Sequence, residues 1–155
     1  MIKLMEVSSE NRVLLWNMLQ GYLQEMCAYY EIAQDANGCY LYKYFDAYFS
    51  DPDRKALLIN SDYRIAGFAL INTHSYIGAS PDYVLAEFCI LPEYRKQHIG
   101  SQAAACILET FNGCWELKYH NSNSAAAGLW KCVTEGYAPR RYRLEDESVL
   151  SFRTN

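Results

Sequence analysis

The chain has 155 residues, of which 51% are hydrophobic, 21% charged and 15% aromatic, and its formal net charge is −4. Domains commonly have about 100–200 residues, so we expect residues 1–155 to form one domain, and this composition excludes a disordered chain. The acidic balance argues against a general nucleic-acid binder, which needs clustered Lys and Arg. No apolar run approaches the roughly 18–20 residues of a membrane span, and no apolar signal core opens the chain, so we expect a cytoplasmic protein.

The first half of the chain alternates between strand and helix patterns. Apolar residues at three- and four-residue steps predict a helix after the opening strand, capped by Ser8 or Ser9. A break at Asn37-Gly38 separates this helix from a short aromatic one, which Asp51-Pro52 ends. A turn at Ser61-Asp62 then joins two strands into a predicted β-hairpin. In chain order the predicted segments are strand 2–7, helix 13–26, helix 40–49, strand 55–60 and strand 64–73.

The second half continues the alternation. A strand ends at Pro92, an Ala-rich helix ends at Asn112-Gly113, and a further helix begins at Ser122 or Ser124. A turn at Glu145-Asp146 separates two closing strands. In chain order these segments are strand 83–91, helix 99–111, strand 114–119, a helix to about 135, and strands 137–144 and 148–153. The order β-α-α-β-β-β-α-β-α-β-β predicts an α/β fold with helices on the faces of a sheet.

The six cysteines form no CxxC pair, and no histidine lies at zinc-finger spacing from two of them. Cys89 and Cys106 lie within apolar runs, where a free cysteine behaves as a small hydrophobic residue. We therefore expect reduced thiols rather than disulfides, and we expect no metal site.

The segment from Glu87 to Gln102 carries the strongest chemical signal, because a strand leads through a basic turn into the start of a helix. A helix N-terminus presents free amides and a partial positive charge, which attract phosphate. Gly100 allows the backbone to come close to a ligand, and Arg95 and Lys96 add cations. The pattern predicts a pyrophosphate site, although it is neither a Walker loop nor GxGxxG; the alternative is a solvated basic turn.

This segment resembles motif A of the GCN5-related N-acetyltransferase (GNAT) superfamily, in which a strand ending in V-x-P-x-Y-R leads into [Q/R]-x-x-G-x-[G/A]. Pro92, Tyr94 and Arg95 match the first part, and Arg95 to Gly100 fills the second. One position departs from the pattern, since His98 stands where the first glycine is usual. Its side chain either crowds the pyrophosphate or bonds to it.

A second block, Asn123 to Trp130, resembles the N-x-x-A-x-x-[L/F]-Y motif of the same superfamily. Asn123 and Ala126 match, whereas Trp130 replaces the usual tyrosine. Gly136-Tyr137 is similar to the Gly-Phe that follows in the family. The resemblance extends from Ala56 to Tyr137, and the residues before it match only loosely.

The resemblance implies a mixed, splayed central sheet with helices on both faces, acetyl-CoA as cosubstrate and an amine as acceptor. It implies that the backbone of Phe88, Cys89 and Ile90 pairs with pantetheine as an added strand does, and that an amide there polarises the thioester carbonyl. It also implies that Asn123 touches the pantetheine and that Trp130 packs against it. The pyrophosphate would be held by Arg95 and by the amides of Lys96, Gln97, His98, Ile99, Gly100 and Ser101.

Glu87 interrupts the otherwise apolar strand from Tyr83 to Leu91. A carboxylate where strands part is able to accept a proton from an ammonium substrate, directly or through water, and such general base catalysis contributes about 10²–10⁴-fold. The alternative is a solvent-facing residue in an alternating strand. We predict an N-acetyltransferase that moves an acetyl group from acetyl-CoA to an amine by direct attack in a ternary complex, with Glu87 as the base.

Trp130 raises a question about the leaving thiolate, because an indole donates a hydrogen bond but is not an acid, whereas a tyrosine is able to protonate the thiolate. Three outcomes are open: Tyr119 or Tyr137 substitutes, the thiolate leaves unassisted or through water, or catalysis is lost. The last outcome makes the chain a non-catalytic CoA-binding sensor or interaction module, which is the alternative function. A binder of another phosphate-bearing nucleotide is a third hypothesis.

Tyrosines are dense before residue 50. Helix-spaced aromatic residues commonly belong to a core, but in the resembled family this region forms the wall on the acceptor side. Tyrosine rings and nearby carboxylates suit a cationic amine through charge and cation–π attraction. Tyr30 and Tyr44 are therefore the candidate acceptor contacts. The closing hairpin would also permit a homodimer.

Overall fold

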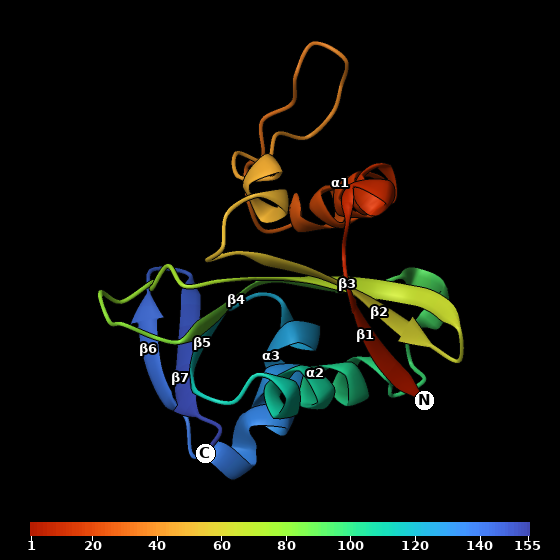
Figure 1. The fold of residues 1–155 in the computed structure, drawn as a ribbon. Coiled ribbons are helices and arrows are strands. Elements are labelled where there is room, and N and C mark those ends of the chain that lie inside the picture. Colours follow the sequence, from red (N-terminus) through yellow and green to blue (C-terminus); the bar gives the residue numbers. More distant parts are fainter.

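A seven-stranded sheet runs through the computed structural model, which describes residues 1–155 (Figure 1). Its strands lie in the order β1-β2-β3-β4-β5-β7-β6. The strands are β1 (Ile2–Glu6), β2 (Lys55–Ser61), β3 (Arg64–Asn72), β4 (Tyr83–Ile90), β5 (Cys114–His120), β6 (Arg140–Leu144) and β7 (Glu147–Arg153). The helices are α1 (Arg12–Met26), α2 (Ile99–Thr110) and α3 (Ser124–Thr134).

The sheet opens between β4 and β5, the only neighbouring strands that run parallel. Tyr83–Leu85 of β4 pairs with Trp115–Leu117 of β5, and beyond this short ladder the two strands part. The rest of β4, residues 86–90, has no strand partner on the β5 side. This confirms the prediction of a mixed, splayed sheet.

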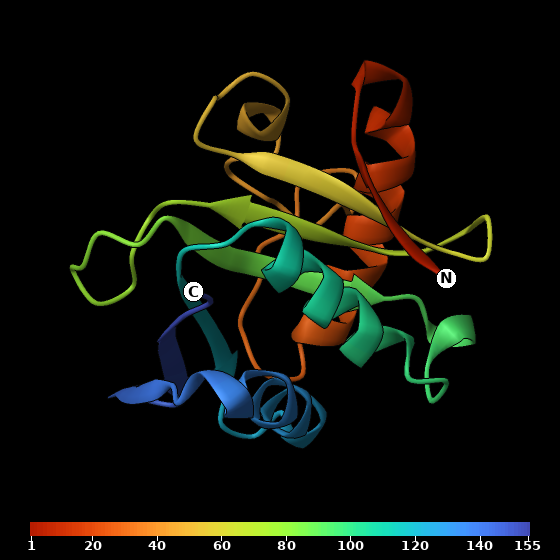
Figure 2. The ribbon, with the colours of Figure 1, turned by 60° about the horizontal axis from the view of Figure 1, so that its bottom comes forward.

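Helix α1 covers one face of the sheet, and α2 and α3 cover the other (Figures 1 and 2). On the first face Leu15 and Leu19 of α1 share a buried cluster with Phe68 of β3. On the opposite face Ile107 of α2 shares a cluster with Trp115 of β5. Each helix thus buries an apolar stripe against the sheet, and helices on both faces are confirmed.

A β-bulge in β4 decides which way Glu87 faces. Leu70 of β3 lies opposite Glu87, but the next residue, Ile71, lies opposite Leu85, so Ala86 is an extra residue in β4. Leu85 packs into the core on the α2–α3 face, whereas Ala86 packs on the α1 face. In a regular strand Leu85 and Glu87 would share a face; the bulge instead brings Glu87 to the side of α1.

The segment Tyr40–Phe49 is not the helix that its spacing predicts. Only Asp46–Phe49 forms a 3-10 turn, and Tyr40 pairs with Gln34 in an isolated bridge. The side chain of Gln20 in α1 explains the difference: its Nε2 donates to the Tyr40 carbonyl at 2.8 Å, and its Oε1 accepts from the Tyr40 amide at 2.7 Å. Both backbone groups of Tyr40 are thereby satisfied outside a helix.

The remaining differences are small. The first strand of the closing hairpin begins at Arg140 rather than Tyr137, because Glu135–Tyr137 extends α3 as a 3-10 turn. The other predicted strands and helices are all present.

All six cysteines are free thiols. None of the helices combines the length and the apolar character that crossing a membrane requires.

Gly67 of β3 lies opposite Ile90 and has no room for a side chain, since a Cβ there would overlap the carbonyl oxygen of Cys89. We predict that Gly67→Ala lowers the free energy of unfolding by about 2–3 kcal/mol, because the backbone of β4 must shift. Gly21→Ala is the matched control, since a Cβ at this helical position meets no atom within 4 Å. Urea denaturation measures both variants, and a Gly67→Ala protein as stable as Gly21→Ala would contradict the prediction.

Candidate active site

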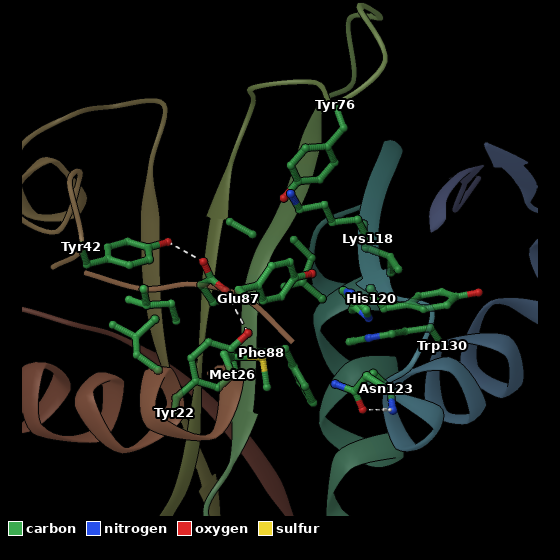
Figure 3. Close-up of a pocket in the computed structure, with 18 of the residues that line it drawn as sticks. Tyr22, Met26, Tyr42, Tyr76, Glu87, Phe88, Lys118, His120, Asn123 and Trp130 are labelled. Atoms are coloured by element: carbon green, nitrogen blue, oxygen red, sulfur yellow. Dashed lines mark hydrogen bonds between the residues drawn. The ribbon is translucent and has the colours of Figure 1, made fainter. Parts of the chain in front are cut away.

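Two adjoining pockets lie where β4 and β5 part. The first, named the carboxylate pocket, has a volume of about 420 Å³ and contains Glu87 (Figure 3). The second, named the loop pocket, has a volume of about 370 Å³ and lies against Lys96 and Gly100 at the turn before α2. The two share the lining residues Tyr22, Met26, Phe88, Asn123, Ala126 and Trp130. One extended molecule is therefore able to reach from the turn to the neighbourhood of Glu87.

The turn before α2 has the backbone geometry of an anion site. Lys96 and His98 adopt positive φ angles of 62° and 63°, and α2 begins at the next residue, Ile99. The amides from Lys96 to Ser101 donate no hydrogen bond within the protein. Consecutive free amides at a helix N-terminus form a ready site for a phosphate group. The left-handed φ at His98 also explains why glycine is usual at this position in the motif.

Arg95 does not stand free beside this turn. Its two terminal nitrogens donate to the Glu25 carboxylate at 2.8 and 2.7 Å, and its Nε donates to the Ile90 carbonyl at 2.8 Å. The hydrogen bonds from Arg95 lower the pKa of Glu25, and the same bonds raise the pKa of Arg95. Arg95 thus ties the end of α1 to the turn, and the free backbone amides are the main groups that could hold an anion there.

The loop pocket brings together most of the coenzyme contacts that the sequence predicts. Its lining includes Phe88, Cys89, Ile90, Arg95, Lys96, Gly100, Asn123 and Trp130. The side chains of the other four residues lie elsewhere. Ile99 is buried, Gln97 donates to the Glu93 carbonyl, and Ser101 donates to the carbonyl of His98, whose own side chain is exposed. Only their backbone amides are placed to contribute to an anion site.

The edge of β4 beyond Leu85 offers backbone groups to a ligand, because β5 does not pair with it there. This edge includes Phe88, Cys89 and Ile90, as an added strand-like ligand would require. Cys89 itself is buried, and burial raises the pKa of its thiol to about 12. A thiol with so high a pKa is a poor nucleophile, so Cys89 serves as part of the wall.

Glu87 is partly buried and accepts two phenolic hydrogen bonds, from the Tyr22 hydroxyl at 2.9 Å and from the Tyr42 hydroxyl at 2.7 Å (Figure 3). Burial raises the pKa of Glu87, and the two hydrogen bonds and the charge of Lys118 oppose that rise only in part. Burial and the nearby carboxylate also raise the pKa of both phenols. Glu87 is therefore a stronger base than an exposed carboxylate, and the phenols are poor proton donors.

Of the two tyrosines predicted as acceptor contacts, only one lies in a pocket. Tyr30 lines the carboxylate pocket. Tyr44 does not: it is exposed, and the Arg54 guanidinium lies 4.5 Å from its ring centre, outside both pockets. Tyr22 and Tyr42, which the sequence analysis did not single out, occupy the wall instead. For Tyr22 the helical apolar spacing of α1 was the available signal, and for Tyr42 there was none.

A charged pair from β5 and β7 lies at the carboxylate pocket, with Lys118 in its wall and Glu147 behind it. The Nζ of Lys118 lies 3.2 Å from the Glu147 carboxylate and 4.6 Å from the ring centre of Tyr76. The Tyr30 hydroxyl donates to the same Glu147 carboxylate at 2.7 Å. Sequence reasoning missed Lys118 and Glu147, because they meet only through the pairing of β5 with β7. Nowhere in the chain do three or more His, Cys, Asp or Glu side chains gather as a metal site would require.

The start of α3 supplies the wall shared by both pockets. The Asn123 side-chain oxygen accepts from the Ala126 amide at 3.1 Å and caps the helix. Trp130 is 5% exposed and packs edge-to-face on Phe88, with ring centres 5.1 Å apart. Of the two tyrosines considered as acids, Tyr119 lines the carboxylate pocket, whereas Tyr137 stacks on Phe152 outside both pockets.

The architecture matches solved acetyltransferases at low sequence identity. An acetyltransferase from Thermus thermophilus superposes with a TM-score of 0.71 at 13% identity, covering 98% of this chain and 95% of that one. The PaiA N-acetyltransferase from Thermoplasma acidophilum, solved with coenzyme A, gives 0.62 at 14% identity and 99% coverage of both chains. Diaminobutyrate acetyltransferase EctA from Paenibacillus lautus, solved with its substrate L-2,4-diaminobutyric acid and coenzyme A, gives 0.64 at 12% identity, covering 99% of this chain and 95% of that one.

These likenesses establish the fold, and the sequence itself establishes the family. No curated protein matches the sequence. The sequence model of the acetyltransferase (GNAT) family, however, matches residues 18–132, a span that includes the turn before α2, Glu87 and the start of α3. The chain therefore belongs to the GNAT acetyltransferase family.

Proposed function

We propose that the protein transfers an acetyl group from acetyl-CoA to an amine within a ternary complex. The observation that carries this proposal is the pair of joined pockets, with free helix amides at one end and the Glu87 carboxylate at the other. A donor with a diphosphate and a long acyl-bearing arm fits the first end, and an amine that must lose a proton fits the second. Family membership supports acyl transfer in general.

On the donor side, the amides from Lys96 to Ser101 bind the diphosphate. The unpaired edge of β4 at Phe88–Ile90 pairs with the pantetheine arm, and an amide of this edge polarises the thioester carbonyl. Asn123 and Trp130 form the opposite wall. The complex of PaiA with coenzyme A supports this placement, since the two folds superpose over nearly the whole chain.

On the acceptor side, Glu87 takes a proton from the ammonium form of the substrate, directly or through water. The free amine then attacks the carbonyl carbon and a C–N bond forms. The C–S bond breaks and its electron pair goes to sulfur, and the second proton, which the nitrogen loses on becoming an amide, passes to the thiolate or to solvent. Tyr22 and Tyr42 hold the carboxylate in place through their hydrogen bonds. Glu87 gives its proton to solvent after the product amide and coenzyme A have formed.

The alternative is a module that binds coenzyme A or an acyl-CoA without catalysis. Trp130 favours it, because an indole in the wall beside the thioester has no acidic proton for the leaving thiolate. Two measurements on the same protein separate the functions: calorimetric titration with coenzyme A, and release of free thiol from acetyl-CoA with a panel of amines. We expect both binding and amine-dependent thiol release. Binding without release on any amine favours the module, and no binding contradicts both functions.

The base role of Glu87 predicts a pH dependence. The ionised carboxylate is the active form, so kcat/KM of the wild type falls as pH drops through the raised pKa of Glu87. We predict that Glu87→Gln lowers kcat/KM by about 10²-fold at neutral pH, removes this acid limb and leaves coenzyme A affinity unchanged. Steady-state kinetics across the pH range and calorimetry check it. A variant that retains the acid limb would exclude Glu87 as the base.

The raised pKa of Glu87 also predicts that Glu87→Gln makes the folded protein more stable at neutral pH. A carboxyl group with a raised pKa favours the folded state only while it is protonated; that contribution is complete below the usual pKa of Glu and is lost as pH rises through the folded pKa. Glu87→Gln should therefore melt at a higher temperature than the wild type at neutral pH, with the difference shrinking in acid. Thermal unfolding at both pH values measures it, and a wider gap in acid than at neutral pH would refute it.

The left-handed backbone at His98 predicts a change in the free energy of unfolding when this residue is replaced. A left-handed φ costs a non-glycine residue about 1–2 kcal/mol, and glycine loses about 0.5–1 kcal/mol more entropy on folding. We predict that His98→Gly stabilises the protein by about 0.5–1 kcal/mol, and that His98→Ala, which keeps the Cβ, does not. Chemical denaturation compares the two. Calorimetry with coenzyme A then shows whether the imidazole crowds the diphosphate, in which case affinity rises, or bonds to it, in which case affinity falls.

A further inference from the structure

The charges around the carboxylate pocket restrict the amine it accepts. Three carboxylates lie in or beside this pocket, from Glu87, Glu116 and Glu147. Glu116 is buried, and both its oxygens are engaged, by the Ser75 hydroxyl at 2.6 Å and by the Tyr76 amide at 2.8 Å. It neither lines the pocket nor offers an oxygen to a ligand.

Glu147 is neutralised by its neighbours. Lys118 lies 3.2 Å from one of its oxygens, and the Tyr30 hydroxyl donates to the same oxygen at 2.7 Å. The charge of Lys118 is balanced in turn, so this pair provides neither a second anionic site nor a free cationic one. Glu87 is left as the one carboxylate of the pocket without a cationic partner in contact.

The histidine of this pocket already has a partner within the protein. His120 accepts a hydrogen bond at Nδ1 from the Ser122 amide at 3.1 Å, so this nitrogen is not available to a ligand. The pocket therefore has a place for one ammonium group, at Glu87.

Apart from two amides, the rest of the wall is aromatic and apolar. Asn72 donates to the Tyr48 hydroxyl and accepts from the His74 amide, and the Asn123 oxygen accepts from the Ala126 amide. Phenol rings surround Glu87 and extend toward β5, and aliphatic side chains fill the gaps between them. These lining residues are Tyr22, Tyr30, Tyr42, Tyr76 and Tyr119, with Leu23, Met26, Ile32, Leu85 and Leu117. A second ammonium or a carboxylate of the substrate would lose its water here without gaining a partner, which is costly.

The turn after α1 limits the size of the acceptor. The Tyr29 and Tyr30 rings each lie 5.4 Å from the His120 ring, and Tyr30 is hydrogen-bonded to Glu147 of β7. These contacts join the turn after α1 to the far side of the opening. With a pocket volume of about 420 Å³, near the lower end of the range for small-molecule sites, the arrangement suits a small molecule better than a protein segment.

We propose that the acceptor is a small primary monoamine with an apolar or aromatic body, and not a polyamine, a zwitterionic amino acid or a protein amine. This rests on the proposed function. It also separates this site from that of EctA, whose substrate, L-2,4-diaminobutyric acid, is a diamino acid.

Pairs of matched amines test the proposal on the wild-type protein with acetyl-CoA. n-Hexylamine and cadaverine are near-isosteres that differ in a terminal methyl against a terminal ammonium, and phenethylamine and phenylalanine differ in a carboxylate. We expect kcat/KM to favour the monoamine of each pair at least about tenfold. A preference for cadaverine, spermidine, phenylalanine or a peptide N-terminus would overturn the proposal. Absence of turnover on every amine would instead count against the proposed function.

A variant that removes the cationic partner of Glu147 gives a second test. Lys118→Met removes the cation that neutralises Glu147, so the pocket gains a second anionic site. We expect the ratio of kcat/KM for cadaverine over n-hexylamine to rise about tenfold. Lys43→Met, the same change at an exposed position outside both pockets, is the control and should leave the ratio unchanged. A ratio that is equal in the folded Lys118→Met variant and the wild type would overturn the charge argument.

Discussion

The parting of β4 and β5 is the constraint on which the site depends. Backbone groups inside a protein need hydrogen-bond partners, and a sheet normally supplies them strand by strand. Here the hydrogen bonding between β4 and β5 ends at Leu85 and Leu117, so an unpaired strand edge lies in the middle of the sheet. Because the two strands are parallel, the segments that follow them, the turn into α2 and the start of α3, lie at the same side of that opening. One topological feature therefore brings a helix N-terminus, an Asn cap and a free strand edge together.

The chemistry on the acceptor side depends on a second irregularity, the bulge at Ala86. It places Glu87 among the tyrosines of the α1 face rather than in the α2–α3 core. A carboxylate there is partly desolvated, which makes it a stronger base and also costs stability. The phenols that hold it are poor acids for the same reason. In the proposed reaction, Glu87 is therefore well suited to remove a proton, whereas the thiolate would leave with the help of Tyr119, of water or of no group.

Sequence reasoning identified the family and the fold where one short segment holds the whole signal. The turn from Arg95 to Gly100 and the block from Asn123 to Trp130 are local patterns, and the fold brings both to the loop pocket. The cap of α3, by contrast, is Asn123 and neither of the two serines expected. Sequence reasoning failed where a contact depends on pairing at long range. Glu25 meets Arg95 across 70 residues, and Tyr42 rather than Tyr44 faces the pocket because Gln20 keeps the segment out of a helix. No periodicity within the segment could show which of the two tyrosines faces Glu87.

The ion pair between Glu25 and Arg95 links two parts to which the proposed function assigns different substrates. Helix α1 contributes to the wall of the carboxylate pocket, and Arg95 belongs to the turn beside the loop pocket. A displacement of α1 away from the sheet would pull on that turn through two short charged hydrogen bonds. Under the proposed function, a bulkier amine that displaced α1 would also disturb the turn that is proposed to bind the donor, so selectivity for one substrate would be coupled to affinity for the other.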